Sequence, residues 1–410
     1  MPTQGEMNID ERRKYLGIMR RRYREAGRTE QSHLLDEIEQ VTQLHRKSVL
    51  RLLGQSLERQ ARTVQRQRTY GAVVDDALRV IAESFDYIAA ERLTPNLPWM
   101  AEQLARHGEL DVIPSLIEQL DQISVSTVRR ILQRTRQDEP RLLPRRGPEN
   151  ANQATRDVPM RRIPWDETRP GHWEADLVHH GGREARGVYV HTLQMVDVAT
   201  GWSERVAVLG RGYLAMKDGF LRVLARVPFA IDELHPDNGS EFFNAHLRRF
   251  FGEKVKDAQL SRSRPWHRND NRFVEQKNSS LVRAYLGDYR LDTVAQTQAL
   301  NALYDQMWLY YNLFQPVMRL CEKVYLHEED GTQRLRRRFD EARTPFDRLC
   351  ATDAISIDRG HVLTELRRAT NPRQLRKEIY TALDHLFALP CAAPGSTENV
   401  LETLATPVLD

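Results

Sequence analysis

The stretch Trp173–His179 reads WEADLVH, and it decides the fold of the residues around it. Apolar and acidic residues alternate along it, which is typical of a β-strand with side chains on two faces. A period of two places Glu174 and Asp176 on one face and Trp173 on the other. An aspartate in the middle of a strand is costly to bury without a partner, and a divalent cation would offset its charge. We therefore expect Asp176 to serve a site, with Glu174 either near that site or paired with an arginine.

The residues that follow continue the sheet. Val188–Val196 and Ser203–Val208 are short β-rich runs, with turn signals at Gly181-Gly182 and Thr200-Gly201. Three consecutive strands with tight connections predict an antiparallel meander. Further along, the pattern predicts a helix over 213–227, a strand over 231–235, a helix over 242–251, a short strand near 257–260 and a last helix around Glu275. This β-β-β-α-β-α-β-α order is similar to that of a ribonuclease-H-like α/β fold with a mixed five-stranded sheet.

Two more acids follow in later elements. Asp237 ends an apolar run and enters the turn DNGS, which taken alone is ordinary turn chemistry. Glu275 lies in the segment 269–278, NDNRFVEQKN, which reads as the start of a helix. Helical spacing would put Asn271, Glu275 and Asn278 on one face. Two strands and a helix that each deliver a carboxylate can hold two Mg²⁺ ions over a phosphate.

The three segments that contain these acids together resemble the catalytic motifs of a known family. They are PGHWEAD over 170–176, HPDNGSEF over 235–242 and NDNRFVEQKN over 269–278. In sequence and in spacing they are similar to the motifs of DDE transposases with a retroviral-integrase-like core. Among these they look most like bacterial insertion-sequence transposases of the ISNCY group. The similarity covers roughly residues 165–320.

The resemblance implies a function and a set of site residues. Asp176, Asp237 and Glu275 become the catalytic metal ligands for two Mg²⁺ ions, with Mn²⁺ able to substitute. Asn278 matches a position beside the DNA, and Lys277 is a phosphate contact. The implied activity is nicking at the ends of a mobile element and transfer of the freed 3′-hydroxyl to target DNA, without a covalent enzyme intermediate. The implied partners are double-stranded DNA, both element ends and target, and further copies of the chain in a homo-oligomer on DNA; no small-molecule substrate is implied.

The N-terminal segment 34–54 has apolar residues at helical spacing, which predicts a helix, a short turn and a second helix that ends at Gly54. This plan is typical of a helix-turn-helix DNA-binding domain. Four side chains of the second helix would point outward, toward phosphates or bases: His45, Arg46, Lys47 and Arg51. The simpler interpretation is a helical hairpin with a basic exposed face.

A second helix-turn-helix pattern lies in the segment 120–132. Ser124 or Ser126 can cap its last helix. The side chains left near the exposed amino-terminal end of that helix are Thr127, Arg129 and Arg130. Two such units in tandem could recognise a longer DNA site than either alone.

Length and composition suggest several domains. At 410 residues the chain exceeds one ordinary domain, and residues 137–168 are rich in proline and arginine, as expected of a linker. The expected plan is a helix-turn-helix domain over 8–70, a second helical domain over 71–136, the linker over 137–168, the catalytic core over 169–320, a helical region over 321–390 and a disordered tail over 391–410.

Composition also excludes several classes of protein. With 40% hydrophobic and 29% charged residues, the chain is typical of soluble globular proteins. It contains no secretory pattern at its start and no apolar run near the ~20 residues that span a bilayer, so we expect no membrane partner and a cytoplasmic, nucleoid-associated protein. Its three cysteines form no CxxC pair, which excludes a disulfide framework. Arginine clusters such as Arg336–Arg338 suggest a polyanionic partner.

Two other functions fit the same pattern. One is a sequence-specific DNA-binding protein whose ribonuclease-H-like core is inactive. The other is a nuclease of that fold that hydrolyses DNA without joining it. The complete set of three acids favours catalysis over the first alternative, and the tandem DNA-binding units disfavour the second.

Overall fold

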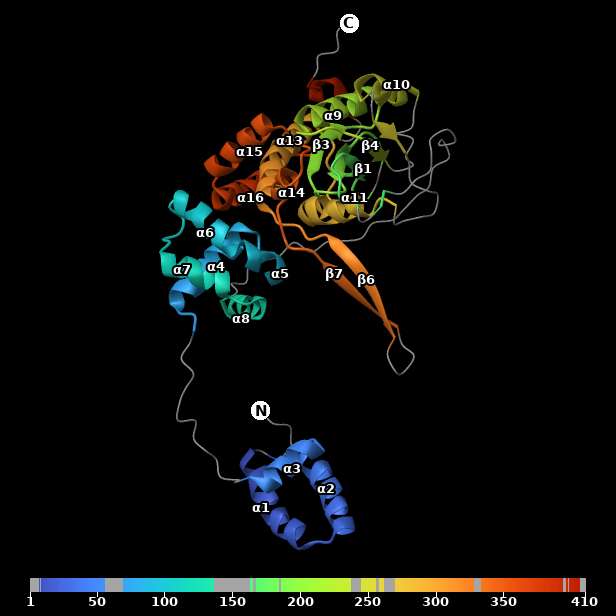
Figure 1. Ribbon diagram of the computed structural model, residues 1–410. Helices are drawn as coiled ribbons and strands as arrows, with labels where there is room; N and C mark the ends of the chain where they lie inside the picture. Colours follow the sequence, from blue (N-terminus) through green and yellow to red (C-terminus); the bar gives the residue numbers. More distant parts are fainter. Residues whose placement is uncertain are drawn as a thin grey trace. The chain divides into compact units, whose positions relative to one another are not determined.

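The computed structural model describes residues 7, 9–55, 69–135, 163–164, 167–183, 186–236, 245–255, 258–261, 270–327, 333–393, 396 and 398–405. The chain divides into two compact units, Met1–Thr69 and Tyr70–Asp410 (Figure 1).

No helix in the described ranges combines the length and the apolar character that crossing a membrane requires.

The first unit is a three-helix domain made of α1 (Ile9–Glu25), α2 (Arg28–Thr42) and α3 (Arg46–Gly54). α2 ends because Gln43 adopts a left-handed conformation, with φ of 57°, and its N–H donates to the carbonyl of Glu39. The helix, turn and second helix expected over 34–54 are present. A small apolar core joins the three helices: Leu16, Met19, Leu34, Leu35, Ile38, Val49 and Leu53.

The second unit begins with a helical module. Its elements are α4 (Ala72–Ser84), α5 (Ala90–Leu93), the 3₁₀ turn η1 (Thr94–Asn96), α6 (Leu97–Arg106), α7 (Pro114–Gln122) and α8 (Val125–Thr135). Ser124 caps α8, since its hydroxyl oxygen accepts the N–H of Thr127 at 3.3 Å. The apolar side chains of this module belong to the same buried core as those of the sheet that follows.

The sheet of the second unit has five strands in the order β3-β2-β1-β4-β5. β1 pairs antiparallel with β2, and β2 with β3, whereas β1–β4 and β4–β5 are parallel. This mixed order confirms the ribonuclease-H-like, integrase-like α/β core expected from the sequence. The strands are β1 (His172–His179), β2 (Val190–Asp197), β3 (Ser203–Leu209), β4 (Glu233–Pro236) and β5 (Gln259–Leu260).

Helices cover the sheet, and every residue of β2 and β3 is buried. The helix α9 (Tyr213–Arg226) lies close on β3 at Gly219, where an added Cβ would be 2.9 Å from Cγ1 of Val208. The remaining helices of this core are α10 (Ala245–Lys254), α11 (Arg272–Lys277), the π-helix η2 (Asn278–Arg283), α12 (Ala284–Leu286), α13 (Val294–Leu309) and the π-helix η3 (Tyr310–Phe314).

Side chains close the outer edge of β3. Asn301 of α13 accepts the N–H of Ala207 at 2.8 Å and donates to its carbonyl at 2.9 Å. Asn312 of η3 makes the same pair of bonds with Ser203, each at 2.9 Å. Arg226 donates to the carbonyl of Arg205 between them. Both backbone groups of Ser203 and Ala207 and the carbonyl of Arg205 are thereby satisfied without another strand.

Asn301→Ala is expected to lower the free energy of unfolding by about 2–4 kcal/mol, because two buried backbone groups of Ala207 lose their partner. Gln298→Ala, an exposed substitution on the same helix, should change it by less than about 0.5 kcal/mol. Chemical denaturation of both variants measures the difference. Equal effects would mean that the Asn301 bonds do not stabilise the edge.

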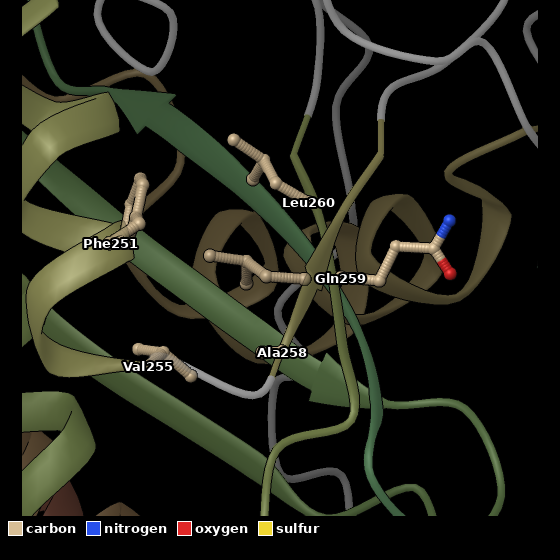
Figure 2. Close-up of a pocket in the computed structure, with 7 residues that line it drawn as sticks. Phe251, Val255, Ala258, Gln259 and Leu260 are labelled. Carbon is tan, nitrogen blue, oxygen red and sulfur yellow. The ribbon is translucent and has the colours of Figure 1, made fainter.

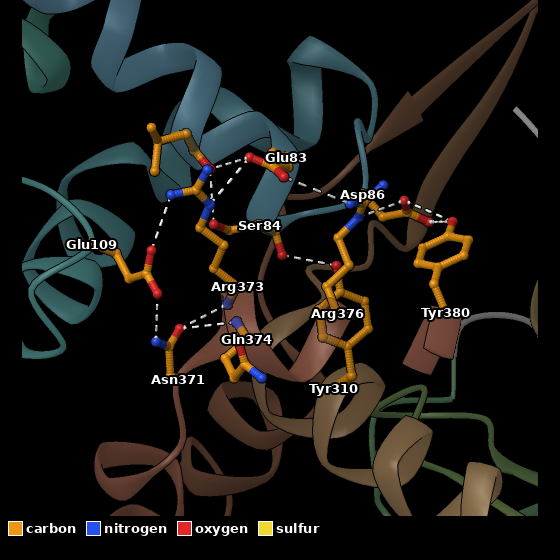
Figure 3. Close-up of polar contacts among 11 residues, drawn as sticks. Glu83, Ser84, Asp86, Glu109, Tyr310, Asn371, Arg373, Gln374, Arg376 and Tyr380 are labelled. Carbon is orange, nitrogen blue, oxygen red and sulfur yellow. Dashed lines mark hydrogen bonds and ion pairs between the residues drawn. The ribbon is translucent and has the colours of Figure 1, made fainter. Parts of the chain in front are cut away.

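A polar network joins the helical module to the C-terminal helix α16 (Pro372–Ala388) (Figure 3). Arg373 of α16 binds Glu83 of α4 at 2.8 Å and Glu109 at 3.0 Å. Arg376 binds Asp86 at 3.0 Å. Asp86 follows α4 with a positive φ of 53°, a strained conformation that the surrounding bonds hold in place. Two tyrosines also donate to Asp86, Tyr285 and Tyr380.

His191 on β2 is buried between aromatic rings, and neither ring nitrogen has a hydrogen-bond partner among the described residues. Burial and the neighbouring His179 lower the pKa of His191 to about 3. The unfolded chain takes up this proton as the pH falls below about 6.5, so the contribution of His191 to stability is complete above that value and is lost toward lower pH.

His191→Phe should therefore reduce the acid sensitivity of the fold. The phenyl ring can keep the stacking on Tyr189, where the ring centroids are 4.6 Å apart. We expect the loss of stability between about pH 7.5 and about pH 5 to shrink by about 2 kcal/mol relative to the unchanged protein. Thermal unfolding at the two pH values tests this, and an unchanged pH dependence would contradict it.

The C-terminal region differs from the sequence prediction at its start. The expectation of a purely helical segment over 321–390 is wrong there, because an antiparallel hairpin comes first, formed by β6 (Leu320–His327) and β7 (Gln333–Phe339). Beyond it the region is helical as expected. Its helices are α14 (Pro345–Cys350), α15 (Ile357–Ala369) and α16. The 3₁₀ turn η4 (Val400–Thr403) lies in the segment that was expected to be a disordered tail, and the N–H of Ala405 after it donates to Asp218 at 3.0 Å.

Candidate active site

A row of polar side chains crosses one face of the sheet. Asp176 on β1 lies opposite Gln194 on β2, and Gln194 lies opposite Arg205 on β3. Gln194 and Arg205 are fully buried, and their side-chain polar atoms have no hydrogen-bond partner among the described residues. The guanidinium of Arg205 instead faces the rings of Tyr304 and Tyr311 at 5.9 and 5.4 Å. Buried polar groups of this kind are unusual in a core that serves packing alone.

Asp176 is half-buried at the end of this row. Its Oδ1 accepts the N–H of Leu177 at 2.8 Å, and its Oδ2 accepts a hydrogen bond from Nδ2 of Asn278 at 2.6 Å. The structure thus brings together two residues that the sequence singled out, 102 positions apart. The short bond fixes the orientation of the carboxylate relative to the helix that follows α11.

Glu174 lies on the same face of β1 and contacts the backbone of α11. It is buried, and its Oε2 accepts the N–H groups of Phe273 at 2.7 Å and Val274 at 2.9 Å. These are donors of the first turn of α11, which have no partner within the helix. Burial raises the pKa of Glu174 to about 8, although these two hydrogen bonds act to lower it. Glu174 therefore attaches the Glu275 helix directly to β1.

Glu275 is exposed on α11, whereas Asn271 and Asn278 are buried. Asn271 precedes the helix as its N-cap, so the three residues differ in burial and in their position on α11. α11 continues without interruption into the π-helix η2, which begins at Asn278. π-helical turns widen a helix locally and are frequent at functional sites.

Lys277 is half-buried near several arginines. Burial, followed by the positive charges of Arg205, Arg92 and Arg319, lowers the pKa of Lys277 to about 7. The side chain therefore lies in a cationic environment. Its role as a phosphate contact stays a prediction.

Asp237 lies outside the described residues. The described part of β4 ends at Pro236, which lies opposite Ala175 in the parallel register with β1. The next residues of the two segments are Asp237 and Asp176. Among the described residues, no group of three carboxylate, imidazole or thiolate side chains could hold a metal ion. The two expected ligands within that part of the chain, Asp176 and Glu275, both supply oxygen, the donor that Mg²⁺ prefers.

The proposed DNA contacts of the first unit fall into two groups. Arg46 binds Glu39 at 3.2 Å and also Asp36, which attaches α3 to α2. His45 caps α3, since its Nδ1 accepts the N–H of Lys47 at 3.3 Å. The side chains of Lys47 and Arg51 are exposed.

The α8 helix shows a similar division. Arg129 forms an ion pair with Glu91 of α5, and the hydroxyl of Thr127 lies 3.0 Å from that of Ser124. These contacts hold the helix and its cap. Arg130 is exposed. DNA binding by any of these residues stays a prediction.

A small pocket of about 160 Å³ lies elsewhere, between α10 and the β4–β5 edge (Figure 2). The side chains of Phe251, Val255 and Leu260 face it, whereas that of Gln259 points away. The described residues that line it are mostly apolar.

Two solved structures are similar to the core at low scores. The catalytic core domain of BIV integrase matches with a TM-score of 0.26 and 18% identity, over 35% of this chain and 83% of that one. A simian T-cell lymphotropic virus intasome in complex with the PP2A regulatory subunit B56 gamma matches with a TM-score of 0.26 and 15% identity, over 46% of this chain and 62% of that one. The fold class rests on the strand order and register described above.

No family model matches the chain. The uncharacterized protein y4rM of Sinorhizobium fredii (strain NBRC 101917 / NGR234) is 35% identical over 308 residues, which make up 74% of this chain and 86% of that protein. With this identity over most of both chains, the protein belongs to the same family as y4rM and carries an integrase-like core.

Proposed function

We propose that the protein is a DNA transposase of the insertion-sequence type, which binds the ends of a mobile element and catalyses metal-dependent nicking and strand transfer. One observation carries the proposal most: two contacts join β1 and the Glu275 helix around Asp176. Asn278 holds the Asp176 carboxylate, and Glu174 holds the first turn of α11. A strand-borne acid and a helix-borne acid are thus kept in a fixed relation, as a phosphoryl-transfer site requires.

In this proposal Asp176, Asp237 and Glu275 hold two Mg²⁺ ions, or Mn²⁺ in their place. All three are hard oxygen donors, and the buried contacts of Asp176 leave its carboxylate oriented rather than mobile. When bound, the ions would supply activation of water or of a 3′-hydroxyl and stabilisation of the leaving oxygen.

The rest of the chain would deliver DNA to this site. Lys47, Arg51 and Arg130 are the exposed basic residues on the two predicted recognition helices, and they suit contacts with phosphates or base edges. Arg46, Arg129 and the capping residues would act indirectly, by holding those helices. The protein would work as a homo-oligomer on paired element ends and target DNA.

The test is to incubate the full chain with the DNA that flanks its gene, in Mg²⁺ or Mn²⁺. We expect nicks at the 3′ ends and products joined to a target plasmid. Binding without cleavage would favour a DNA-binding protein with an inactive core. Cleavage without joining would favour a nuclease. Either outcome would overturn the proposal.

A further inference from the structure

The β6–β7 hairpin is a separate two-stranded sheet (Figure 1). Its register runs from Leu320 opposite Phe339 to His327 opposite Gln333. Within the described residues no third strand joins it, so each strand has one edge without a β-partner. An isolated two-stranded ribbon is only marginally stable in water, so this one depends on its attachment to the rest of the unit.

The ribbon is strongly basic. β7 reads QRLRRRF, and β6 reads LCEKVYLH, with a single acid at Glu322. Arg336, Arg337 and Arg338 are all exposed. The contact between Arg338 and Glu322 spans 3.9 Å with both side chains more than half exposed, so it neutralises little of the charge. Strand alternation places Arg336 and Arg338 on the same face, about 7 Å apart along the strand.

The base of the ribbon is firmly anchored. Asp340 follows β7, and its Oδ1 accepts the N–H of Arg319, just before β6, at 2.6 Å. Arg348 of α14 binds the same carboxylate at 2.7 Å. The guanidinium of Arg319 lies 4.5 Å from the ring centroid of Phe273, in the first turn of α11. The ribbon therefore starts beside the helix that carries Glu275.

We propose that the β6–β7 ribbon is a DNA-binding arm, with Arg336 and Arg338 on the phosphate backbone of a duplex beside the active site. This inference rests on the proposed function, because that function is what identifies the polyanion as DNA. Charge complementarity favours DNA, and a two-stranded ribbon also has the dimensions to enter a major groove. In the sequence, the residues between the two strands include the acids Glu328, Glu329 and Asp330, so the proposal assigns the DNA contacts to β7.

Two other roles would explain an exposed basic ribbon. Charges on an edge strand can simply prevent pairing with another chain, but charges of either sign would achieve this. A second copy of the chain could also cover the ribbon. The one-sided charge of β7 argues against such self-association, since two copies would bring like charges together.

The test compares three forms of the full-length protein: the unchanged chain, R336A/R338A, and a control, R359A/R368A. The control removes the same charge from exposed positions on α15. The probe is a fluorescein-labelled random duplex of about three helical turns, titrated without divalent metal over a range of salt. Because no cleavage is needed, failure of the catalytic proposal and failure of this one give different results.

We expect R336A/R338A to bind this duplex at least about tenfold more weakly near 0.1 M salt. The negative slope of log K against log salt should become shallower by about 2, one unit for each lost phosphate contact. R336K/R338K should restore the slope, and thermal unfolding should show all variants folded. If R336A/R338A binds the duplex as tightly as the control does, the proposal is overturned, and protection of the strand edge becomes the explanation for these arginines. A changed oligomeric state with unchanged DNA affinity would overturn it in favour of a second copy.

Discussion

Asp176→Asn is expected to reduce strand transfer in Mg²⁺ by at least about 10³-fold, the effect of losing several kcal/mol of transition-state stabilisation. The amide keeps the shape of the side chain and can still accept the bond from Asn278. It loses the negative charge, which a divalent cation requires of this ligand. Single-turnover joining of a nicked element end to a plasmid measures the effect.

The control for this substitution is Asp288→Asn, which removes the same charge from an exposed turn of the same unit. It should leave joining within a few-fold of the unchanged protein. Both variants should bind element ends with unchanged affinity, because neither residue is a predicted DNA contact. Joining retained by the Asp176 variant would remove that residue from the proposed metal site.

Glu174→Ala is expected to lower strand transfer by about 10²-fold, since a displacement of about 1 Å in a catalytic group can have an effect of that size. The alanine leaves the N–H groups of Phe273 and Val274 without their acceptor. The first turn of α11 then loses its attachment to β1, and Glu275 loses its fixed position. Joining is measured beside thermal unfolding and end binding, so that a general loss of fold is recognised.

Glu174→Gln separates the role of this residue as a hydrogen-bond acceptor from a role as a metal ligand. An amide oxygen can accept the same two N–H groups, so strand transfer should stay within a few-fold of the unchanged protein. A metal ligand would not tolerate the loss of its charge. If the glutamine variant is as inactive as the alanine variant, Glu174 acts through its charge and the positioning role is wrong.

Much of the sheet was predictable because its strands have a regular pattern of residues and are bounded by turn residues. WEADLVH alternates over a full strand and pairs with the next strand, β2, while the turn at Thr200-Gly201 places β3 beside β2. The hairpin at 320–339 was not predictable by the same means. The consecutive residues 336–339 of β7 are all exposed, no apolar alternation marks the run, and QRLRRRF is equally compatible with an exposed helix.

The site was predictable in its acids and much less so in their partners. A mid-strand Asp176 and a helical Glu275 can be found from local pattern, but the hydrogen bond from Asn278 joins segments 102 residues apart. The basic residues show the same limit. Arg46 and Arg129 resemble DNA contacts in sequence, whereas in the structure each forms an ion pair with an acid on a neighbouring helix. Sequence spacing cannot tell a cation that faces solvent from one that is already paired.

The closed edge of β3 restricts how copies of this protein can assemble. With Asn301 and Asn312 bonded to the backbone groups of Ala207 and Ser203, β3 offers few free groups to a strand from a neighbouring molecule. At the opposite end of the sheet, the described part of β5 is only two residues long and offers little backbone for pairing. Copies that gather on DNA would therefore meet through surfaces other than the edges of the five-stranded sheet, or through the DNA itself. Such an assembly can come apart when the DNA is released, which continuous sheets shared between subunits would resist.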